Sequence, residues 1–394
     1  MPEGIPVSDR TGRLIVAQSG PEGFSAFHPN PLPPDPPLRI DGALQALIDE
    51  ANQSLGRLDG ITLLLPDPDQ FLYTFIRKEA VLSSQIEGTQ SSLSDLLLYE
   101  NDAASGVPIG DVRESANYIR AVNHGIDSIA ANRLPLSHRL LREAHALLLS
   151  DGRGADRAPG EFRRVQNWIG GTRPGNARYV PPPWTQVAPA MGDLEKFLHD
   201  QPVRTPVLLK AALAHVQFET IHPFLDGNGR VGRLLITLLL YSEKVLRRPL
   251  LYLSLYLKRH RDAYYDHLQR VRTEGAWEEW LGFFLEGVVE VAASTTETIQ
   301  RIVEMVQRDR ERIHALGRGA ATAHRIHELA TRRVLLRASN VASQLRLSDP
   351  PVYAAIARLQ EAGILSEVTG RKRGRVYAYD EYLALLNEGT TEPV

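Results

Sequence analysis

Residues 222–233 read HPFLDGNGRVGR, and they decide how the rest of the chain is interpreted. One helical pattern ends near Glu219 and another begins near Arg230, so this stretch is predicted to be a loop that leads into a helix N-terminus. Gly227 and Gly229 are expected to take positive φ, which lets the backbone approach a ligand closely. Amides at a helix N-terminus carry partial positive charge. The loop is therefore predicted to bind phosphate.

The side chains of this stretch suit chemistry on a phosphate ester. Arg230 and Arg233 lie three residues apart on one helix face, and both are expected to reach phosphate oxygens. Asp226 supplies the kind of oxygen that Mg²⁺ prefers. His222 can be neutral near pH 7 and is the candidate to accept a proton from an attacking hydroxyl. Phe224 is expected to anchor the loop in the core.

At every specified position, residues 222–233 resemble the Fic motif, His-x-Phe-x-Asp/Glu-Gly-Asn-Gly-Arg-x-x-Arg. The resemblance implies a mainly α-helical Fic core that transfers AMP from ATP, with Mg²⁺, to a Ser, Thr or Tyr hydroxyl of a protein, the chain itself included. His222 is then the implied base and Asp226 the implied metal ligand. The implied ATP contacts are Pro223, Phe224, Asp226, Gly227, Asn228, Gly229, Arg230, Arg233, Asn167, Trp168, Ile169, Gly170, Tyr264 and Tyr265.

Residues 160–183 have β-branched and aromatic residues around a Gly/Pro/Asn turn, which predicts a β-hairpin. It either packs on the surface or corresponds to the flap of the family, which aligns the target segment as an added strand. Tyr264 and Tyr265 either contact adenine or pack in the core. Arg272 stands where the family often has an asparagine on the adenine side.

Residues 83–88 read SSQIEG and resemble the inhibitory pattern of the family, Ser/Thr-x-x-x-Glu-Gly/Asn. Ser83 and Glu87 are expected to share a helix face, and Gly88 to end the helix. The resemblance implies that Glu87 pairs with Arg233 and holds activity down. A solvated glutamate at a helix end is the alternative. Removal of AMP, with Glu87 orienting a water, is a second possible activity.

Helical periodicity runs from about residue 41 to 315, with one long helix over 288–313. The domains are predicted as an extended Pro-rich arm (1–40), an N-terminal helical region with the inhibitory helix (41–110), a Fic core (111–315) and a winged-helix domain (320–394).

The predicted winged helix rests on helices followed by strands at 364–368 and 376–379 around a basic turn. Residues 331–375 hold nine Lys/Arg against three Asp/Glu. The module is expected either to bind DNA or to mediate homodimer contacts. A DNA-binding regulator with the Fic core as sensor is the competing function. The DNA contacts would be Arg358, Arg371, Lys372, Arg373 and Arg375.

Composition excludes several other classes of protein. The net charge of -2 gives no whole-chain preference for nucleic acid or membrane. The absence of cysteine excludes disulfides, thiol nucleophiles and zinc sites with sulfur ligands. No apolar run approaches the ~20 residues that a bilayer requires, and Met1–Arg13 lacks the apolar core of a signal peptide. We expect a soluble cytoplasmic protein with no membrane partner.

Overall fold

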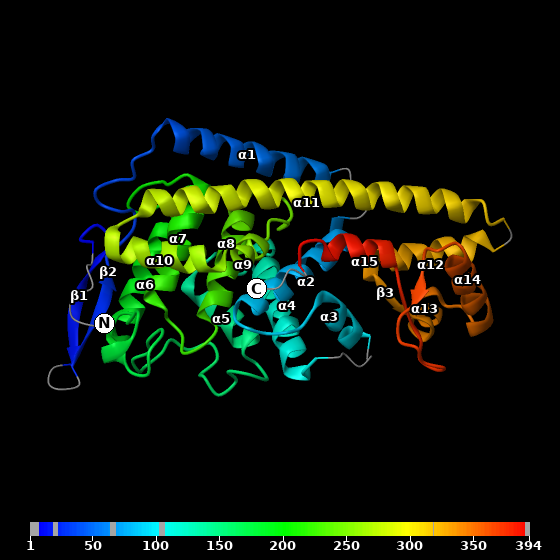
Figure 1. Cartoon of the computed structure of the whole chain (residues 1–394), viewed down its shortest axis with the longest axis horizontal. Helices are drawn as coiled ribbons and strands as arrows, with labels where there is room; N and C mark the ends of the chain where they lie inside the picture. Colours follow the sequence, from blue (N-terminus) through cyan, green and yellow to red (C-terminus); the bar gives the residue numbers. More distant parts are fainter. Residues whose placement is uncertain (1–7, 19–22, 64–67, 102–106, 318, 391–394) are drawn as a thin grey trace. The chain divides into compact units, whose positions relative to one another are not determined.

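The computed structural model describes residues 8–18, 23–63, 68–101, 107–317 and 319–390 (Figure 1). Parts of the predicted arm (1–7 and 19–22) and Arg318 lie outside the described residues. The chain divides into two compact units, which are described separately. The first comprises 1–56 and 117–291, and the second comprises 57–116 and 292–394.

The fold is mainly helical, as predicted. The helices are α1 (Gly42–Thr62), α2 (Pro68–Ile86), α3 (Leu93–Glu100), α4 (Ile109–Ala130), α5 (His138–Leu148), α6 (Trp184–Leu198), α7 (Val207–Ile221), α8 (Asn228–Ser242), α9 (Ser254–Arg259), α10 (Arg261–Glu274), α11 (Trp277–His314), α12 (Ala320–Arg333), α13 (Ala338–Leu345), α14 (Asp349–Glu361) and α15 (Asp380–Asn387). The single long helix expected over 288–313 is α11, which begins earlier than predicted. No helix within the described residues combines the length and apolar character needed to cross a membrane.

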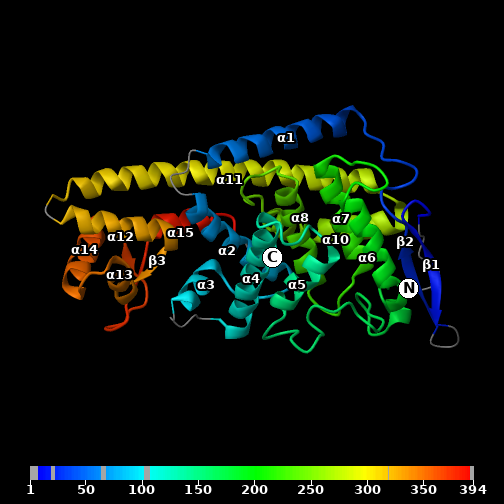
Figure 2. The same cartoon turned by 180° about the vertical axis from the view of Figure 1, so that it is seen from behind.

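Helices α7 and α8 form the centre of the first unit and lie side by side in both views (Figures 1 and 2). Almost every residue of α7 is buried, because the helix is apolar around most of its circumference. The loop between the two helices, residues 222–227, is the predicted phosphate-binding loop. A helix pair packed this firmly gives that loop two fixed ends.

The N-terminal arm contains a β-hairpin that the sequence analysis did not predict. Strands β1 (Gly12–Gln18) and β2 (Phe24–Pro29) pair antiparallel. Ala26 and Phe27 are buried with Ala177, Tyr179 and Val180. The amide of Phe27 donates to the carbonyl of Val180 at 2.9 Å. The arm therefore packs into the first unit.

The hairpin predicted over residues 160–183 is present only in part and does not form a continuous ladder. The only pairing described there is one antiparallel bridge between Ile169 and Tyr179, closed by a 3-10 turn at Pro174–Asn176. Gly170 and Gly171 have φ of 70° and 72°, and three prolines follow Val180. Positive φ and missing amide donors prevent a ladder from extending on either side of the bridge.

The C-terminal module, defined here as residues 320–390, belongs to the second unit. Its elements follow the order α12, β3 (Leu335–Arg337), α13, α14, β4 (Ser366–Glu367), β5 (Val376–Ala378) and α15. The three strands form an antiparallel sheet in the order β3-β5-β4. Strand β3 was not predicted, because three residues between two helices show no period. Within this unit, α2 packs against α12 and α15.

Candidate active site

His222 ends helix α7 in a left-handed conformation, with φ of 49° and ψ of 60°. Its amide donates to the carbonyl of Phe218 at 2.9 Å, which completes the last turn. A residue other than glycine pays a steric cost in this region of the φ/ψ map. Such strained residues cluster at functional sites. The imidazole is thus held at the end of a buried helix, on the first residue of the loop.

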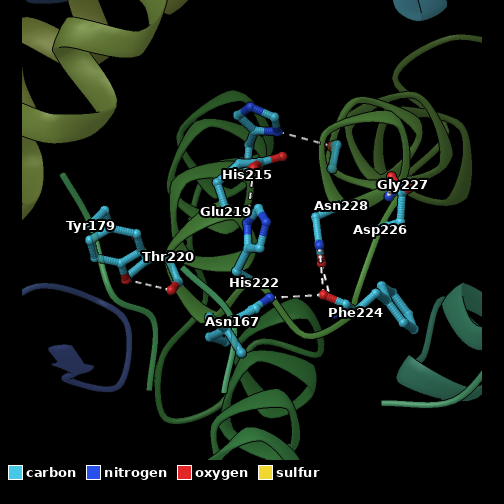
Figure 3. A network of polar contacts seen from close by, with 12 residues as sticks. Asn167, Tyr179, His215, Glu219, Thr220, His222, Phe224, Asp226, Gly227 and Asn228 are labelled. Carbon is cyan, nitrogen blue, oxygen red and sulfur yellow. Dashed lines mark hydrogen bonds and ion pairs between the residues drawn. The ribbon is translucent and has the colours of Figure 1, made fainter. Parts of the chain in front are cut away.

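The loop is closed by the side chain of Asn228 (Figure 3). Its Oδ1 accepts from the amide of Phe224 at 2.8 Å, and its Nδ2 donates to the carbonyl of Phe224 at 2.9 Å. The Nδ2 of Asn167 donates to the same carbonyl at 3.1 Å. Asn228 therefore braces the loop, and Asn167 joins the predicted flap segment to it. Both residues belong to the predicted nucleotide site.

Phe224 is fully buried, which confirms its predicted anchoring role. Its ring stacks on His145 with centroids 3.7 Å apart and planes inclined by 8°. The Nδ1 of His145 accepts from the amide of Gly160 at 2.8 Å, so the Nε2 carries the proton and donates to the carbonyl of Asp226 at 3.0 Å. Burial lowers the pKa of His145 to about 4. This neutral histidine contacts the loop at Phe224 and at Asp226, and it was not predicted from the sequence.

Arg163 fixes the start of the loop. Its amide donates to the carbonyl of Pro223 at 2.9 Å, and its Nε donates to the carbonyl of His222 at 3.0 Å. Its Nη2 also donates to the carbonyl of Pro182. Burial lowers the pKa of Arg163 to about 10, which still leaves the guanidinium charged at neutral pH. Sequence reasoning did not select Arg163, because a pattern does not reveal that an arginine is buried.

Gly227 has φ of 76° and caps the N-terminus of α8, as the loop was predicted to do. The positive φ expected at Gly229 was wrong, since α8 begins at Asn228 and already includes Gly229. The first intrahelical bond runs from the amide of Val231 to the carbonyl of Gly227, at 3.0 Å. First-turn amides have no carbonyl within their own helix. The amides of residues 228–230 thus form the positive end of α8.

Asp226 and the two arginines of the motif surround this helix end. The Oδ1 of Asp226 accepts from the amide of Gly227 at 2.6 Å and lies 3.6 Å from the Nη2 of Arg230. The side chain of Asp226 is 31% exposed, whereas Arg230 and Arg233 are almost fully buried. The described residues contain no group of three or more metal-ligating side chains. A lone accessible carboxylate fits a Mg²⁺ ion that takes its remaining ligands from phosphates and water.

Glu219 lies beside His222 and was not selected from the sequence. Its Oε2 is 3.9 Å from the Nδ1 of His222, and its side chain is 8% exposed (Figure 3). A Cβ placed on Gly232 would meet the Oε1 of Glu219 at 2.3 Å. Gly232, one of the unspecified positions of the loop motif, therefore leaves the space that this carboxylate occupies. The three-residue spacing between Glu219 and His222 was the available signal.

Tyr264 and Tyr265, the two predicted adenine contacts, differ in burial. Tyr264 is only 1% exposed, and its hydroxyl hydrogen bonds with the Nε2 of His215 at 2.8 Å. Tyr265 is half-buried. Tyr264 thus packs in the core, which was the alternative left open, and contact of either tyrosine with adenine stays a prediction. Arg272 donates to the Thr220 hydroxyl at 3.2 Å and the Glu219 carbonyl at 3.2 Å. It ties α10 to the end of α7.

Trp168, Ile169 and Gly170 lie at the base of the bridged segment. Trp168 is 40% exposed and Ile169 is 36% exposed, although both are large and apolar. Apolar side chains left in solvent are available to a ligand or partner. Their contact with a nucleotide stays a prediction.

Ser83 and Glu87 lie at the end of α2, in the second unit. Ser83 is fully buried in α2. The helix ends at Ile86, so Glu87 is the first residue beyond it, and its amide donates to the carbonyl of Ser84 at 3.0 Å. Gly88 has φ of 99°, which agrees with its predicted role as the helix stop. The inhibitory role of Glu87 stays a prediction.

Comparison with known proteins agrees with this geometry. Residues 135–240 match the Fic/DOC family, and residues 45–127 match the Fic/DOC family N-terminal region. The chain belongs to the Fic/DOC family. Its fold is similar to that of a Fic family protein from Desulfovibrio desulfuricans G20, with a TM-score of 0.56 and 22% identity, over 87% of this chain and 97% of that chain. At this identity the likeness concerns the fold alone.

Among curated proteins, the chain is similar to the protein adenylyltransferase Fic of Culex quinquefasciatus. The identity is 31% over 180 residues, which are 42% of this chain and 32% of that protein. It is also 27% identical over 234 residues to the protein of the same name from Drosophila grimshawi, covering 57% of this chain and 45% of the relative. The matches thus span less than half the length of these relatives.

Proposed function

We propose that the chain is a protein adenylyltransferase, which transfers AMP from ATP to a Ser, Thr or Tyr hydroxyl of a protein target, itself included. The observation that carries the proposal is the braced loop over 222–227, which sets His222 beside the positive end of α8. A second support is the name of the distant relatives, protein adenylyltransferase Fic.

The proposed roles follow from charge and position. His222 accepts the proton of the target hydroxyl, whose oxygen attacks the α-phosphorus of ATP. A bond forms between that oxygen and phosphorus, the bond to the β-phosphate oxygen breaks, and pyrophosphate leaves. The first-turn amides of α8 and Arg230 stabilise the negative charge that develops on the phosphate oxygens. Asp226 is the residue that would hold Mg²⁺, which would neutralise phosphate charge.

We also propose that the chain restrains its own activity through Glu87. A carboxylate paired with Arg233 would neutralise the cation intended for the γ-phosphate. ATP would then bind with its α-phosphate out of line with the attacking hydroxyl. The SSQIEG pattern upstream of a complete Fic motif, with Ser83 buried in α2 and Gly88 ending it, supports this regulation.

The proposal is tested by incubating the purified chain with ATP and Mg²⁺ and measuring the intact protein mass. Self-modification should add the mass of one or more AMP groups, slowly in the wild type and faster in Glu87→Gly. Loss of a previously attached AMP, accelerated by the wild-type Glu87, would instead assign AMP removal. No change of mass in either protein or in added targets would contradict transfer.

A second function is proposed for the C-terminal module, as a winged helix that binds DNA. Arg371, Lys372, Arg373 and Arg375 are all exposed in the turn between β4 and β5. Arg358 should contribute less to DNA binding than was expected. It is half-buried, and its Nη1 packs so close to Gly319 that a Cβ on that glycine would clash with it.

Phosphate contacts release counterions, so DNA affinity should fall steeply with salt. Replacing Arg371, Lys372 and Arg373 by alanine should abolish retention of a DNA duplex at low salt and leave AMP transfer unchanged. Full-length protein that shows no affinity at low salt would assign the turn to protein contacts, such as those of a homodimer.

A further inference from the structure

A pocket of about 290 Å³ lies within the second unit, where α2, the end of α3, strand β3 and the first turns of α13 meet. No part of the proposed transfer chemistry uses it. Its charged lining consists of Arg77 from α2, Glu100 from α3, and Arg333 and Arg337 from the C-terminal module. Three guanidinium groups and one carboxylate leave an excess of positive charge.

The single carboxylate is fully engaged on one side of the pocket. The Nε and Nη2 of Arg77 donate to Glu100 at 2.8 and 2.7 Å, and the hydroxyl of Tyr73 donates to it at 2.8 Å. A bidentate arginine with a tyrosine hydroxyl is an arrangement suited to a carboxylate or phosphate. Glu100 is itself a carboxylate held in this way, which indicates the kind of group that the pocket binds.

Arg333 and Arg337 supply the other two positive charges of the lining. Arg333 precedes β3 and Arg337 is its last residue, and the guanidinium of Arg333 lies 5.0 Å from the ring centre of Tyr73. The first turn of α13 also lines the pocket through Asn340, and no side chain caps this helix. An uncapped helix N-terminus adds partial positive charge to that of the two arginines. This excess of positive groups matches an anion.

We propose that this pocket is a regulatory site for a small molecule that carries phosphate or carboxylate groups. The anion binds Arg333 and Arg337 of the C-terminal module, beside the pair of Arg77 and Glu100. Neutralising the surplus charge stabilises the packing of α2 on the module. The regulatory half of this inference rests on the proposed inhibition by Glu87, whereas the binding half does not.

The connection to Glu87 runs along one helix. Tyr73 and Arg77 lie on α2, which continues to Ile86 and places Ser83 and Glu87 at its end. A ligand that binds only when α2 is docked favours the docked state by mass action, by a factor of about one hundred at a hundred times its dissociation constant. Ligand binding therefore strengthens the inhibition.

Binding is tested by calorimetry on the full chain, with citrate and inorganic phosphate as separate probes. The variant Arg333→Gln/Arg337→Gln should bind either probe at least about tenfold more weakly, since two charge-assisted contacts are lost. Arg332→Gln is the matched control, because Arg332 is exposed and pairs with Glu328 at 3.1 Å outside the pocket. The probe that responds to the double change identifies the anionic group. Equal affinity in all three proteins, with unchanged unfolding midpoints, would overturn the site.

Regulation is tested by hydrogen exchange of α2 and by transfer of label from α-labelled ATP at saturating Mg²⁺. The effective probe should slow exchange in α2 and reduce transfer in the wild type and in Arg332→Gln, but not in the double variant. Binding without slower exchange in α2 would overturn the regulatory half. If the chain transfers no AMP at all, the calorimetry and exchange results still decide the site independently of the proposed activity.

Discussion

Asn228 exchanges two hydrogen bonds with the backbone of Phe224, through its Oδ1 at 2.8 Å and its Nδ2 at 2.9 Å. This pair closes the loop between α7 and α8. Asn228 is buried, so Asn228→Ala leaves the amide of Phe224 without that acceptor inside the protein. We expect the free energy of unfolding to fall by ~1–3 kcal/mol.

The carbonyl of Phe224 keeps the donor of Asn167, so the amide should account for most of this loss. Asn228→Asp preserves an acceptor for the amide and should cost less than alanine if the amide dominates. Urea unfolding of the two variants and Asn167→Ala measures the difference. If Asn228→Ala and Asn167→Ala lowered the free energy of unfolding equally and additively, this would contradict the view that both side chains donate to the Phe224 carbonyl.

Gly232 leaves room for the carboxylate of Glu219, since an added Cβ would lie 2.3 Å from its Oε1. Gly232→Ala should destabilise the first unit by ~1–3 kcal/mol and reduce transfer, because the carboxylate beside His222 must move. Gly192→Ala is the matched control, because it also lies within a helix and its Cβ would meet nothing within 4 Å. It should be neutral or stabilising by up to ~1 kcal/mol. Thermal unfolding and label transfer compare the two, and equal effects would refute the contact.

Stability should fall as the pH is lowered from 6.5 towards 4. Burial lowers the pKa of His145 and of His215 to about 4 in the folded chain. The unfolded chain titrates them near ~6.5, so between these values it binds protons that the folded chain does not. Each histidine should then contribute a slope of up to ~1.4 kcal/mol per pH unit, with its full stabilisation present above pH ~6.5. Urea unfolding at several pH values should give a shallower slope for His145→Gln, and an unchanged slope would contradict its neutral burial.

Glu87→Gly should raise self-modification and target modification by roughly tenfold to a hundredfold, because a charge-assisted pair contributes ~1.5–3 kcal/mol. Glu87→Gln should release the restraint only in part, since the amide still fills the space. Glu87→Gly/Arg233→Ala should be inactive again, because Arg233 is the group that the first change frees. Transfer that does not rise in a folded Glu87→Gly protein would remove the inhibition, and a fall would indicate AMP removal.

Helical periodicity predicted the fold well. Helices α7 and α8 are long and apolar, so their local sequence alone indicates a helix without reference to distant residues. The motif likewise located the loop, its helix N-terminus and the buried anchor Phe224. The family membership was therefore predicted from one short stretch.

The supporting residues could not be predicted. Arg163, His145 and Arg272 contact the loop or its flanking helix from distant points of the chain. Their roles depend on burial and on backbone carbonyls, neither of which has a sequence pattern. The hairpin of β1 and β2 was missed for a similar reason, since its buried side depends on Tyr179 and Val180, far along the chain.

The proposed role of His222 as the base in AMP transfer can be measured in the Glu87→Gly background. Purified Glu87→Gly and Glu87→Gly/His222→Ala proteins are incubated with ATP labelled either at the α-phosphate or at the γ-phosphate, with saturating Mg²⁺. We expect Glu87→Gly to take up α-label but not γ-label, and the added His222→Ala to abolish uptake while ATP binding and folding are retained. Uptake of γ-label, or α-label transfer within a few-fold in the His222→Ala protein, would contradict it.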